Sequence, residues 1–186
     1  MAENLILCNR YAKALFDLAE ETDQIEGVYQ DMKLVERVFY ENLSLQGVMK
    51  NQIIKNKSKN DIVRELFASK VSKLSLEFLS FVVRKDRSKS LMGIANAYIE
   101  FYKEHKNITT VILYTTDLAD EETKDSIISV VSRFTDKTVE IQNKIDKSLI
   151  GGFRLFFDGH LYDASLFAKF QKLTRSFSVN VYDKSL

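Results

Sequence analysis

The sequence predicts an α+β protein: an amino-terminal bundle of six helices over residues 1–106, followed by a small carboxyl-terminal α/β domain over residues 107–186. Between residue 3 and about residue 106, apolar side chains recur at spacings of three and four, which is typical of amphipathic helices. From residue 107 the pattern changes to β-branched runs and alternation, which indicate strands. Proline is absent, and because proline interrupts helices, its absence favours a chain rich in long helices.

The first predicted helix carries two apolar stripes. The residues of one stripe lie on the same face of the helix, because they are four, three and four positions apart. It consists of Leu7, Tyr11, Ala14 and Leu18. The other consists of Leu5, Cys8, Ala12, Leu15 and Ala19. A helix with two apolar stripes is expected to bury more than one face.

Five further helices follow, separated by short polar breaks. The second is marked by Ile25, Val28, Met32, Val35 and Phe39, and a short third piece covers residues 43–49. The fourth, after the polar stretch KNKSKND, is marked by Ile62, Leu66 and Val71. The fifth, SLEFLSFVV, is the most apolar and stops at the charged run of residues 84–87. The sixth carries Leu91, Ile94, Tyr98, Phe101 and His105. Short breaks between helices imply an antiparallel bundle.

The second domain begins with a predicted strand, ITTVILYT, over residues 108–115. A helix follows in DEETKDSIISVVSRF, whose acidic first turn suits the positive end of the helix dipole. Alternation over residues 138–145 predicts a half-exposed strand. Two extended runs joined by Asp158-Gly159 then predict a hairpin. A last helix is expected over Leu166 to about Phe177.

Composition argues against several functions. The formal net charge is +1, without the positive excess that a nucleic-acid binder normally has. Cys8 is the single cysteine, so no intrachain disulfide or multi-cysteine metal site is possible. The apolar runs are much shorter than the roughly 20 residues that cross a bilayer, and the amino terminus lacks the basic region of a secretory signal. Any membrane association is therefore expected through a partner.

No motif predicts chemistry. Gly151-Gly152 lacks the spacing of a phosphate loop, and it is interpreted as a turn that needs positive φ or a bulge. His105 and His160 fall in different domains, so neither a shared metal nor a catalytic pair is expected. The only basic cluster, Lys50, Lys55, Lys57 and Lys59, is either an anionic docking patch or a solvated loop and helix start. We predict no catalytic residue, cofactor or metal.

Two segments resemble the delta subunit of F-type ATP synthases, the family of the mitochondrial oligomycin-sensitivity-conferring protein. RYAKALFDLAEE, residues 10–21, is similar to its opening helix. KIDKSLIGGFRLFFDGHLYDASLFAKFQKL, residues 144–173, is similar to its carboxyl-terminal signature. The matching signature residues are Ile145, Asp146, Ser148, Gly151, Gly152, Tyr162 and Asp163. The chain departs from the family at Ala164, where Gly is usual, at Phe167, often Arg, and in the hairpin turn FDGH.

The resemblance implies a stator subunit of the peripheral stalk that is needed to couple proton transport to ATP synthesis. Residues 1–106 would bind the amino-terminal helix of an alpha subunit between the first and fifth helices, and residues 107–186 would bind the carboxyl terminus of the b subunits. The expected groove residues are Leu7, Tyr11, Ala14, Leu18, Glu77 and Phe81. Tyr11 and Phe81 are hypothesised as anchors and Glu77 as polar rim, while Leu18 is left open between groove and core. The absence of a transit peptide suggests the cytoplasmic face of a bacterial membrane.

Two other functions remain to be weighed. A helical adaptor or regulatory protein would share the bundle, but it would not need the signature between residues 145 and 163. A small enzyme with a site assembled across the domains would need clustered catalytic residues, which the sequence does not offer. The stator subunit is therefore the function that the sequence favours.

Overall fold

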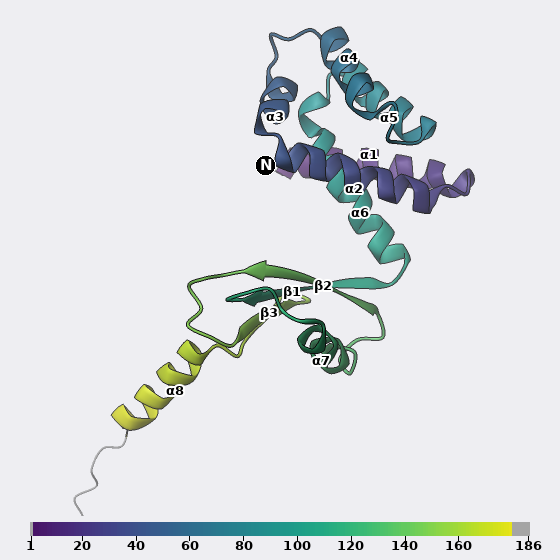
Figure 1. Cartoon of the computed structure of the whole chain (residues 1–186). Coiled ribbons are helices and arrows are strands. Elements are labelled where there is room, and N and C mark those ends of the chain that lie inside the picture. The colour runs from purple at the N-terminus through teal and green to yellow at the C-terminus, as the bar shows by residue number, and fades with distance from the viewer. Residues whose placement is uncertain (1, 180–186) are drawn as a thin grey trace, which may run out of the picture. The chain divides into compact units, whose positions relative to one another are not determined.

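A computed structural model describes residues 2–179, and residues 180–186 of the predicted second domain lie outside the described range. The protein combines helices with one four-stranded sheet, which confirms the α+β class predicted from the sequence. The chain divides into two compact units, Met1–Lys106 and Asn107–Leu186 (Figure 1). None of the helices within the described range is long and apolar enough to cross a membrane.

The first unit is helical throughout. Its elements are α1 (Ala2–Glu21), α2 (Ile25–Glu41), α3 (Leu43–Lys50), α4 (Asn56–Phe67), α5 (Lys73–Arg84), the 3-10 helix η1 (Ser88–Ser90) and α6 (Leu91–His105). Helices α1 and α2 both pack against α6, and α4 packs against α5 (Figure 1). The turns after α1, α5 and α6 place Asp23, Asp86 and Asn107 at positive φ. Asp and Asn tolerate this conformation better than other residues with a Cβ, so they end these helices without glycine.

Only one of the two apolar stripes of α1 enters the core. Cys8, Ala12, Leu15 and Ala19 are at most 4% exposed. Gly93 of α6 permits the close approach of the two helices, because a Cβ there would lie 2.8 Å from Cys8 Sγ. The stripe formed by Leu7, Tyr11, Ala14 and Leu18 is half-buried or exposed instead. Helix α1 therefore keeps an apolar face outside the core of its unit.

Helix α5 is fixed at its start by a buried carboxylate of α2. Asp31, 9% exposed, accepts hydrogen bonds from the backbone nitrogen and the Oγ of Ser72, at 2.9 and 2.6 Å. Ser72 is the N-cap of α5, and its Oγ accepts a hydrogen bond from the Ser75 backbone nitrogen at 3.3 Å. A capping hydroxyl satisfies a free N–H group of the first turn, and a carboxylate there is favoured by the helix dipole. These contacts hold α5 in register with α2.

The buried face of the fourth helix differs from the prediction. Val63 and Phe67 are 1% exposed, whereas Ile62 and Leu66, which were expected to mark the helix, are half-buried. Val71 lies beyond the end of α4. The helix begins at Asn56, inside the stretch that the sequence predicted as a polar break. The buried stripe is therefore offset from the predicted one by one residue, or roughly 100° at 3.6 residues per turn.

Lys59 belongs to the predicted basic cluster, but its side chain is buried, so it is part of neither a docking patch nor a solvated helix start. It is 2% exposed, and its Nζ donates hydrogen bonds to the Met49 carbonyl and to Ser88 Oγ, both at 3.0 Å. Ser88 Oγ donates to the same carbonyl at 2.8 Å. The Met49 carbonyl belongs to the last turn of α3, where carbonyl groups lack helical partners. Lys59 therefore joins the end of α3 to η1.

The second unit is a sheet with one helix packed on it. Its elements are β1 (Ile108–Thr115), α7 (Glu121–Val131), β2 (Thr138–Ile145), β3 (Phe153–Phe157), β4 (His160–Asp163) and α8 (Leu166–Val179). The strand order is β2-β1-β3-β4. Strand β1 pairs in parallel with β2 and antiparallel with β3, which forms a hairpin with β4. The predicted strands and hairpin are confirmed, and α7 ends three residues before the predicted Phe134.

The core of the second unit lies between the sheet and α7 (Figure 1). It contains Val111, Leu113 and Leu155 from the strands and Ile127 and Val131 from the helix, all at most 7% exposed. The acidic start of α7 is capped by Asp120, whose Oδ1 accepts a hydrogen bond from the Thr123 backbone nitrogen at 2.9 Å. Hydrogen bonding from the Thr123 side chain, and next from its backbone nitrogen, lowers the pKa of Asp120. The cap and the apolar stripe together fix α7 on one face of the sheet.

Candidate binding surfaces

A groove on the first unit is formed by the outer stripe of α1 and by α5. Its volume is about 420 Å³. Its lining residues are Leu7, Arg10, Tyr11, Ala14, Phe78, Phe81 and Arg87. The rings of Tyr11 and Phe81 lie on its two helices with their centroids 6.4 Å apart. Phe81 is 40% exposed, so an aromatic surface remains open to solvent.

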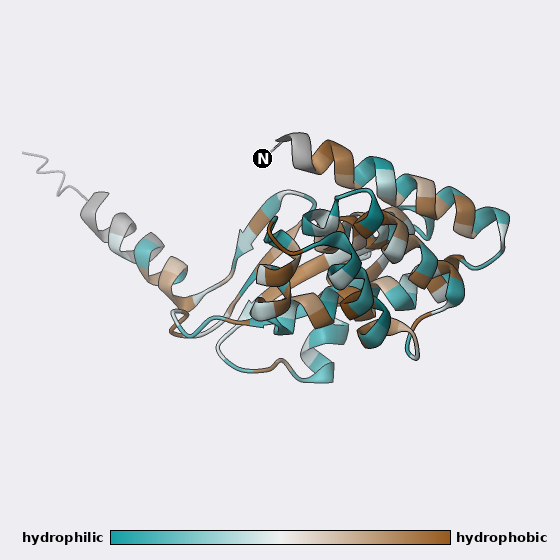
Figure 2. Ribbon diagram, turned by 90° about the horizontal axis from the view of Figure 1, so that it is seen from above, coloured by the Kyte–Doolittle hydropathy of each residue, from teal (hydrophilic) through white to brown (hydrophobic). Residues whose placement is uncertain are grey.

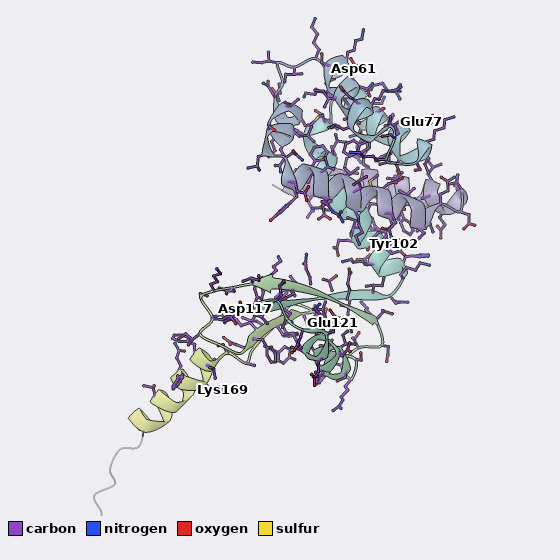
Figure 3. The ribbon with its side chains drawn as sticks, viewed as in Figure 1. Asp61, Glu77, Tyr102, Asp117, Glu121 and Lys169 are labelled. Atoms are coloured by element: carbon purple, nitrogen blue, oxygen red, sulfur yellow. The ribbon has the colours of Figure 1, made fainter. Side chains whose placement is uncertain are left out.

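The structure brings together four of the six residues that the sequence assigned to the groove: Leu7, Tyr11, Ala14 and Phe81. Leu18 is 41% exposed, so it does not belong to the core, and it does not line the groove. Glu77 (labelled in Figure 3) also lies outside the lining. Its Oε1 is 4.0 Å from Lys73 Nζ, one turn earlier on α5. The groove is therefore more apolar on the α5 side than the sequence suggested.

Sequence reasoning missed Arg10, Phe78 and Arg87. The sequence did indicate Phe78, because it precedes Phe81 by three residues and so lies on the same face of the helix. Arg10 lies three residues after Leu7 on the same stripe of α1. Arg87 had no local signal, since it lies beyond α5 and reaches the groove only through the turn at Asp86. One wall of the groove thus depends on tertiary structure.

In the second unit, the signature residues surround Arg154 on β3. Arg154 Nη1 is 3.4 Å from Asp146 Oδ2, and its Nε is 3.3 Å from Asp163 Oδ2. Asp146 also accepts hydrogen bonds from the Oγ and the backbone nitrogen of Ser148, at 2.6 and 2.9 Å. Asp163 accepts from the Ser165 backbone nitrogen at 2.9 Å. Arg154, which the sequence did not single out, therefore connects the two ends of the signature.

These contacts lower the pKa of both carboxyl groups. Hydrogen bonding from Ser148 is the largest cause at Asp146, with the Arg154 charge contributing further. Hydrogen bonding from Ser165 is the largest cause at Asp163, again with a contribution from Arg154. Both side chains are therefore ionised at neutral pH, and their role in this arrangement is to bind the strand arginine.

The two glycines of the signature hold the start of α8. Gly151 and Gly152 have φ values of 157° and 79°, in agreement with the interpretation of the pair as a positive-φ turn. The Gly151 carbonyl accepts a hydrogen bond from the Leu166 backbone nitrogen at 2.9 Å. A Cβ at Gly152 would lie 2.5 Å from the Ala164 carbonyl oxygen. The signature thus packs backbone against backbone where the hairpin leads into α8.

Large apolar side chains remain exposed around this turn. Tyr162 and Ile145 of the signature are 57% and 52% exposed. Leu166, Phe167 and Phe170 of α8 are 42%, 47% and 61% exposed, and α8 begins with hydrophobic residues (Figure 2). Exposed apolar surface of this kind marks sites of protein association.

Nothing in the described part of the chain is arranged for catalysis by a metal. No group of three or more His, Cys, Asp and Glu side chains within residues 2–179 is placed to hold a metal ion. Both surfaces above are apolar areas flanked by charge. Apolar areas flanked by charge are typical of surfaces at which proteins associate.

Comparison with known proteins decides the family. A family model described as ATP synthase delta (OSCP) subunit matches residues 7–177. The chain belongs to the ATP synthase delta (OSCP) subunit family. Its relatives include the ATP synthase subunit delta of Cytophaga hutchinsonii, 34% identical over 172 residues, which are 92% of this chain and 94% of the relative. That of Bacillus cytotoxicus is 31% identical over 178 residues, 95% and 98% of the two chains.

The fold is also that of a solved structure. A chain of the Toxoplasma gondii mitochondrial ATP synthase hexamer superposes with a TM-score of 0.70 at 20% sequence identity, covering 94% of this chain and 99% of that one. As a member of the delta family, the protein is a non-catalytic subunit of the proton-transporting ATP synthase and part of its peripheral stalk. It is a peripheral component of that complex.

Proposed function

We propose that each unit of this stator subunit binds a different part of the ATP synthase. The first unit, a six-helix bundle, binds the amino-terminal helix of an alpha subunit in the groove between α1 and α5. The second unit, a small α/β domain, binds the carboxyl terminus of the b subunits. The protein thereby joins the catalytic head to the stalk on the cytoplasmic face of a bacterial plasma membrane, and it prevents the head from turning with the rotor.

The observation that carries this proposal is the second stripe of α1. Leu7, Tyr11 and Ala14 are not used by the core of their unit, and with Phe78 and Phe81 they line an open groove. An amphipathic helix binds such a groove by inserting apolar side chains at one-turn spacing. Ala14 is exposed and small, so a helix backbone can approach α1 closely at this position.

The exposed apolar residues of the second unit support the other contact. Leu166, Phe167 and Phe170 stand within one and a half turns at the start of α8. The Arg154 contacts with Asp146 and Asp163 hold the turn from which this helix leaves the hairpin. A helix start that is held by these contacts and that exposes apolar side chains suits the binding of another helix.

Two groove variants and one core variant test the head contact. Phe81→Ala removes an aromatic anchor, and Ala14→Asp places a charge on the groove floor. Val82→Ala, at the neighbouring position of α5, truncates a side chain that is 0% exposed. Each variant is titrated calorimetrically with a synthetic peptide of the alpha-subunit amino terminus, and its unfolding is followed by circular dichroism.

The groove variants are expected to weaken binding, and the core variant is expected to lower stability. Phe81→Ala costs at least about 2 kcal/mol of binding, as truncation of a desolvated anchor typically does, with little loss of stability. Val82→Ala lowers the free energy of unfolding by roughly 1–3 kcal/mol, while the folded protein binds the peptide unchanged. Groove variants that lose stability but keep the wild-type affinity would place the alpha contact on another surface.

A further inference from the structure

Two guanidinium groups border the apolar groove without a counter-charge. Arg10 and Arg87 are both among the groove-lining residues, and both are exposed. No carboxylate is among the described residues that line the groove. Among the side chains that the structure describes, neither arginine is paired with an acidic group. The positive charge of the groove is therefore not neutralised by any of these side chains.

The charged residues next to the groove do not supply a counter-charge to Arg10 and Arg87. Glu77, one turn before Phe81, has its carboxylate beside Lys73. Asp86 precedes Arg87 and is exposed, but it does not line the groove. Lys85 adds a third cation, with its Nζ 5.6 Å from the centroid of the Phe81 ring. The open aromatic surface thus lies among three positive charges.

A ligand that covers this surface must satisfy the arginines as well as the apolar side chains. Docking removes water from the guanidinium groups, which is unfavourable unless an acceptor replaces it. A guanidinium presents a planar fork of N–H donors that fits a carboxylate with two parallel hydrogen bonds. A helix with only apolar and basic residues on its docking face would repel both arginines.

We propose that Arg10 and Arg87 select the occupant of the groove: an amphipathic helix whose apolar stripe is flanked by carboxylate side chains that pair with both guanidinium groups. This proposal rests on the proposed function, because the occupant is taken to be the amino-terminal helix of an alpha subunit. Arg10 comes from α1 and Arg87 from the segment after α5. Pairing with both fixes the register of the bound helix along the groove.

Charges at the rim of an interface act mainly on association. They steer the encounter, so their removal lowers the association rate and its dependence on salt, with less effect on dissociation. We expect Arg10→Gln and Arg87→Gln each to reduce affinity by roughly three- to tenfold at low salt. The loss should shrink at high ionic strength, where charges farther apart than a few ångströms are screened.

The test compares two peptides on the full chain. One peptide is the amino terminus of the alpha subunit, and the other is the same peptide with every Asp and Glu replaced by Asn and Gln. Association and dissociation rates are measured by surface plasmon resonance over a series of salt concentrations. Arg84→Gln is the matched control, because Arg84 is an exposed arginine at the end of α5 that does not line the groove.

The proposal expects the carboxylate-free peptide to bind wild-type protein more weakly. Each rim variant keeps one guanidinium group and should discriminate less between the two peptides than wild-type protein does, and the double variant Arg10→Gln/Arg87→Gln should bind both peptides about equally. The proposal is overturned if the two peptides bind wild-type protein alike, or if Arg84→Gln loses as much affinity as the rim variants. Failure of both peptides to bind wild-type protein would instead overturn the proposed alpha contact itself. Circular dichroism of each variant establishes that the fold is intact.

Discussion

Replacing Gly152 by alanine tests how the carboxyl-terminal signature works. The structure assigns this glycine a packing role in the turn before α8, not a role in binding a ligand. Its φ is 79°, and a Cβ built on it would lie 2.5 Å from the Ala164 carbonyl oxygen and 3.0 Å from Ser165 Cα. Both atoms belong to backbone, which cannot rotate away as the end of a flexible side chain can.

The expected cost has two parts. The left-handed conformation costs a residue with a Cβ about 1–2 kcal/mol. The Cβ would also stand roughly 0.8 Å inside an ordinary carbon–oxygen contact of about 3.3 Å, and overpacking of this kind costs typically 1–3 kcal/mol. The sum is roughly 2–5 kcal/mol. A unit of this size has a total stability of roughly 4–12 kcal/mol, so Gly152→Ala should remove a large share of it.

A second glycine provides the matched control. Gly159, in the hairpin turn, has a φ of 77°, and no atom lies within 4 Å of a Cβ built there. Gly159→Ala therefore carries the backbone cost without the collision, and should lose about 1–2 kcal/mol. Urea denaturation gives the total change for each variant. Hydrogen exchange measured by mass spectrometry assigns the loss to peptides of the second unit.

The difference in stability between the two variants tests whether the signature forms a close-packed turn. The difference between Gly152→Ala and Gly159→Ala should be about 1–3 kcal/mol, with Gly152→Ala the less stable. Equal losses would mean that the Ala164 backbone yields to the Cβ without cost, and the account of the signature as a close-packed turn would be refuted. A loss confined to peptides of the first unit would refute it as well.

Three further outcomes are expected. Lys59→Ala should lower the free energy of unfolding by about 1–3 kcal/mol, because it removes a buried donor from both the Met49 carbonyl and Ser88 Oγ. Lys57→Ala, at an exposed position, should change it by less than about 0.5 kcal/mol. The pKa values of Asp146 and Asp163 are lowered in the folded state, so their ionisation stabilises the folded protein at neutral pH, and this stabilisation is lost as pH falls below about 4. Arg154→Met should therefore reduce the loss of stability at acid pH in melting curves measured from pH 7 to pH 2. A curve unchanged from that of wild-type protein would contradict the pairing. Residues 1–106 should fold alone, and a fragment without a cooperative thermal transition by circular dichroism would show that its core is incomplete.

The order of the elements was readable from the sequence because each depends on local pattern. Helices α1 to α6 follow the spacing of apolar residues, and β1 and β2 follow β-branched and alternating runs. The hairpin follows Asp158-Gly159, where both residues have positive φ. The family was also readable, since the signature keeps both its residues and their spacing. Periodicity of this kind is imposed by backbone geometry, so a single chain is enough to show it.

Choices between two possible faces needed the tertiary structure. Either stripe of α1 suited a core by its residues, but the stripe of Cys8, Ala12 and Leu15 is buried because Gly93 allows α6 to approach on that side. The position of α4 depends in the same way on Lys59, whose ammonium group donates hydrogen bonds to the Met49 carbonyl and to Ser88 Oγ, both outside α4. A lysine is normally expected at the surface, and only these distant acceptors make its burial possible.

The sequence by itself determined the fold class, the order of the helices and strands, and the family. The tertiary structure alone decided that Arg87 reaches the groove, and that Arg154 bridges Asp146 and Asp163. The physical reason is the range of the interactions. Helix and strand periods arise between residues a few positions apart, whereas the charges at both surfaces are brought together by packing between elements, which no local pattern records.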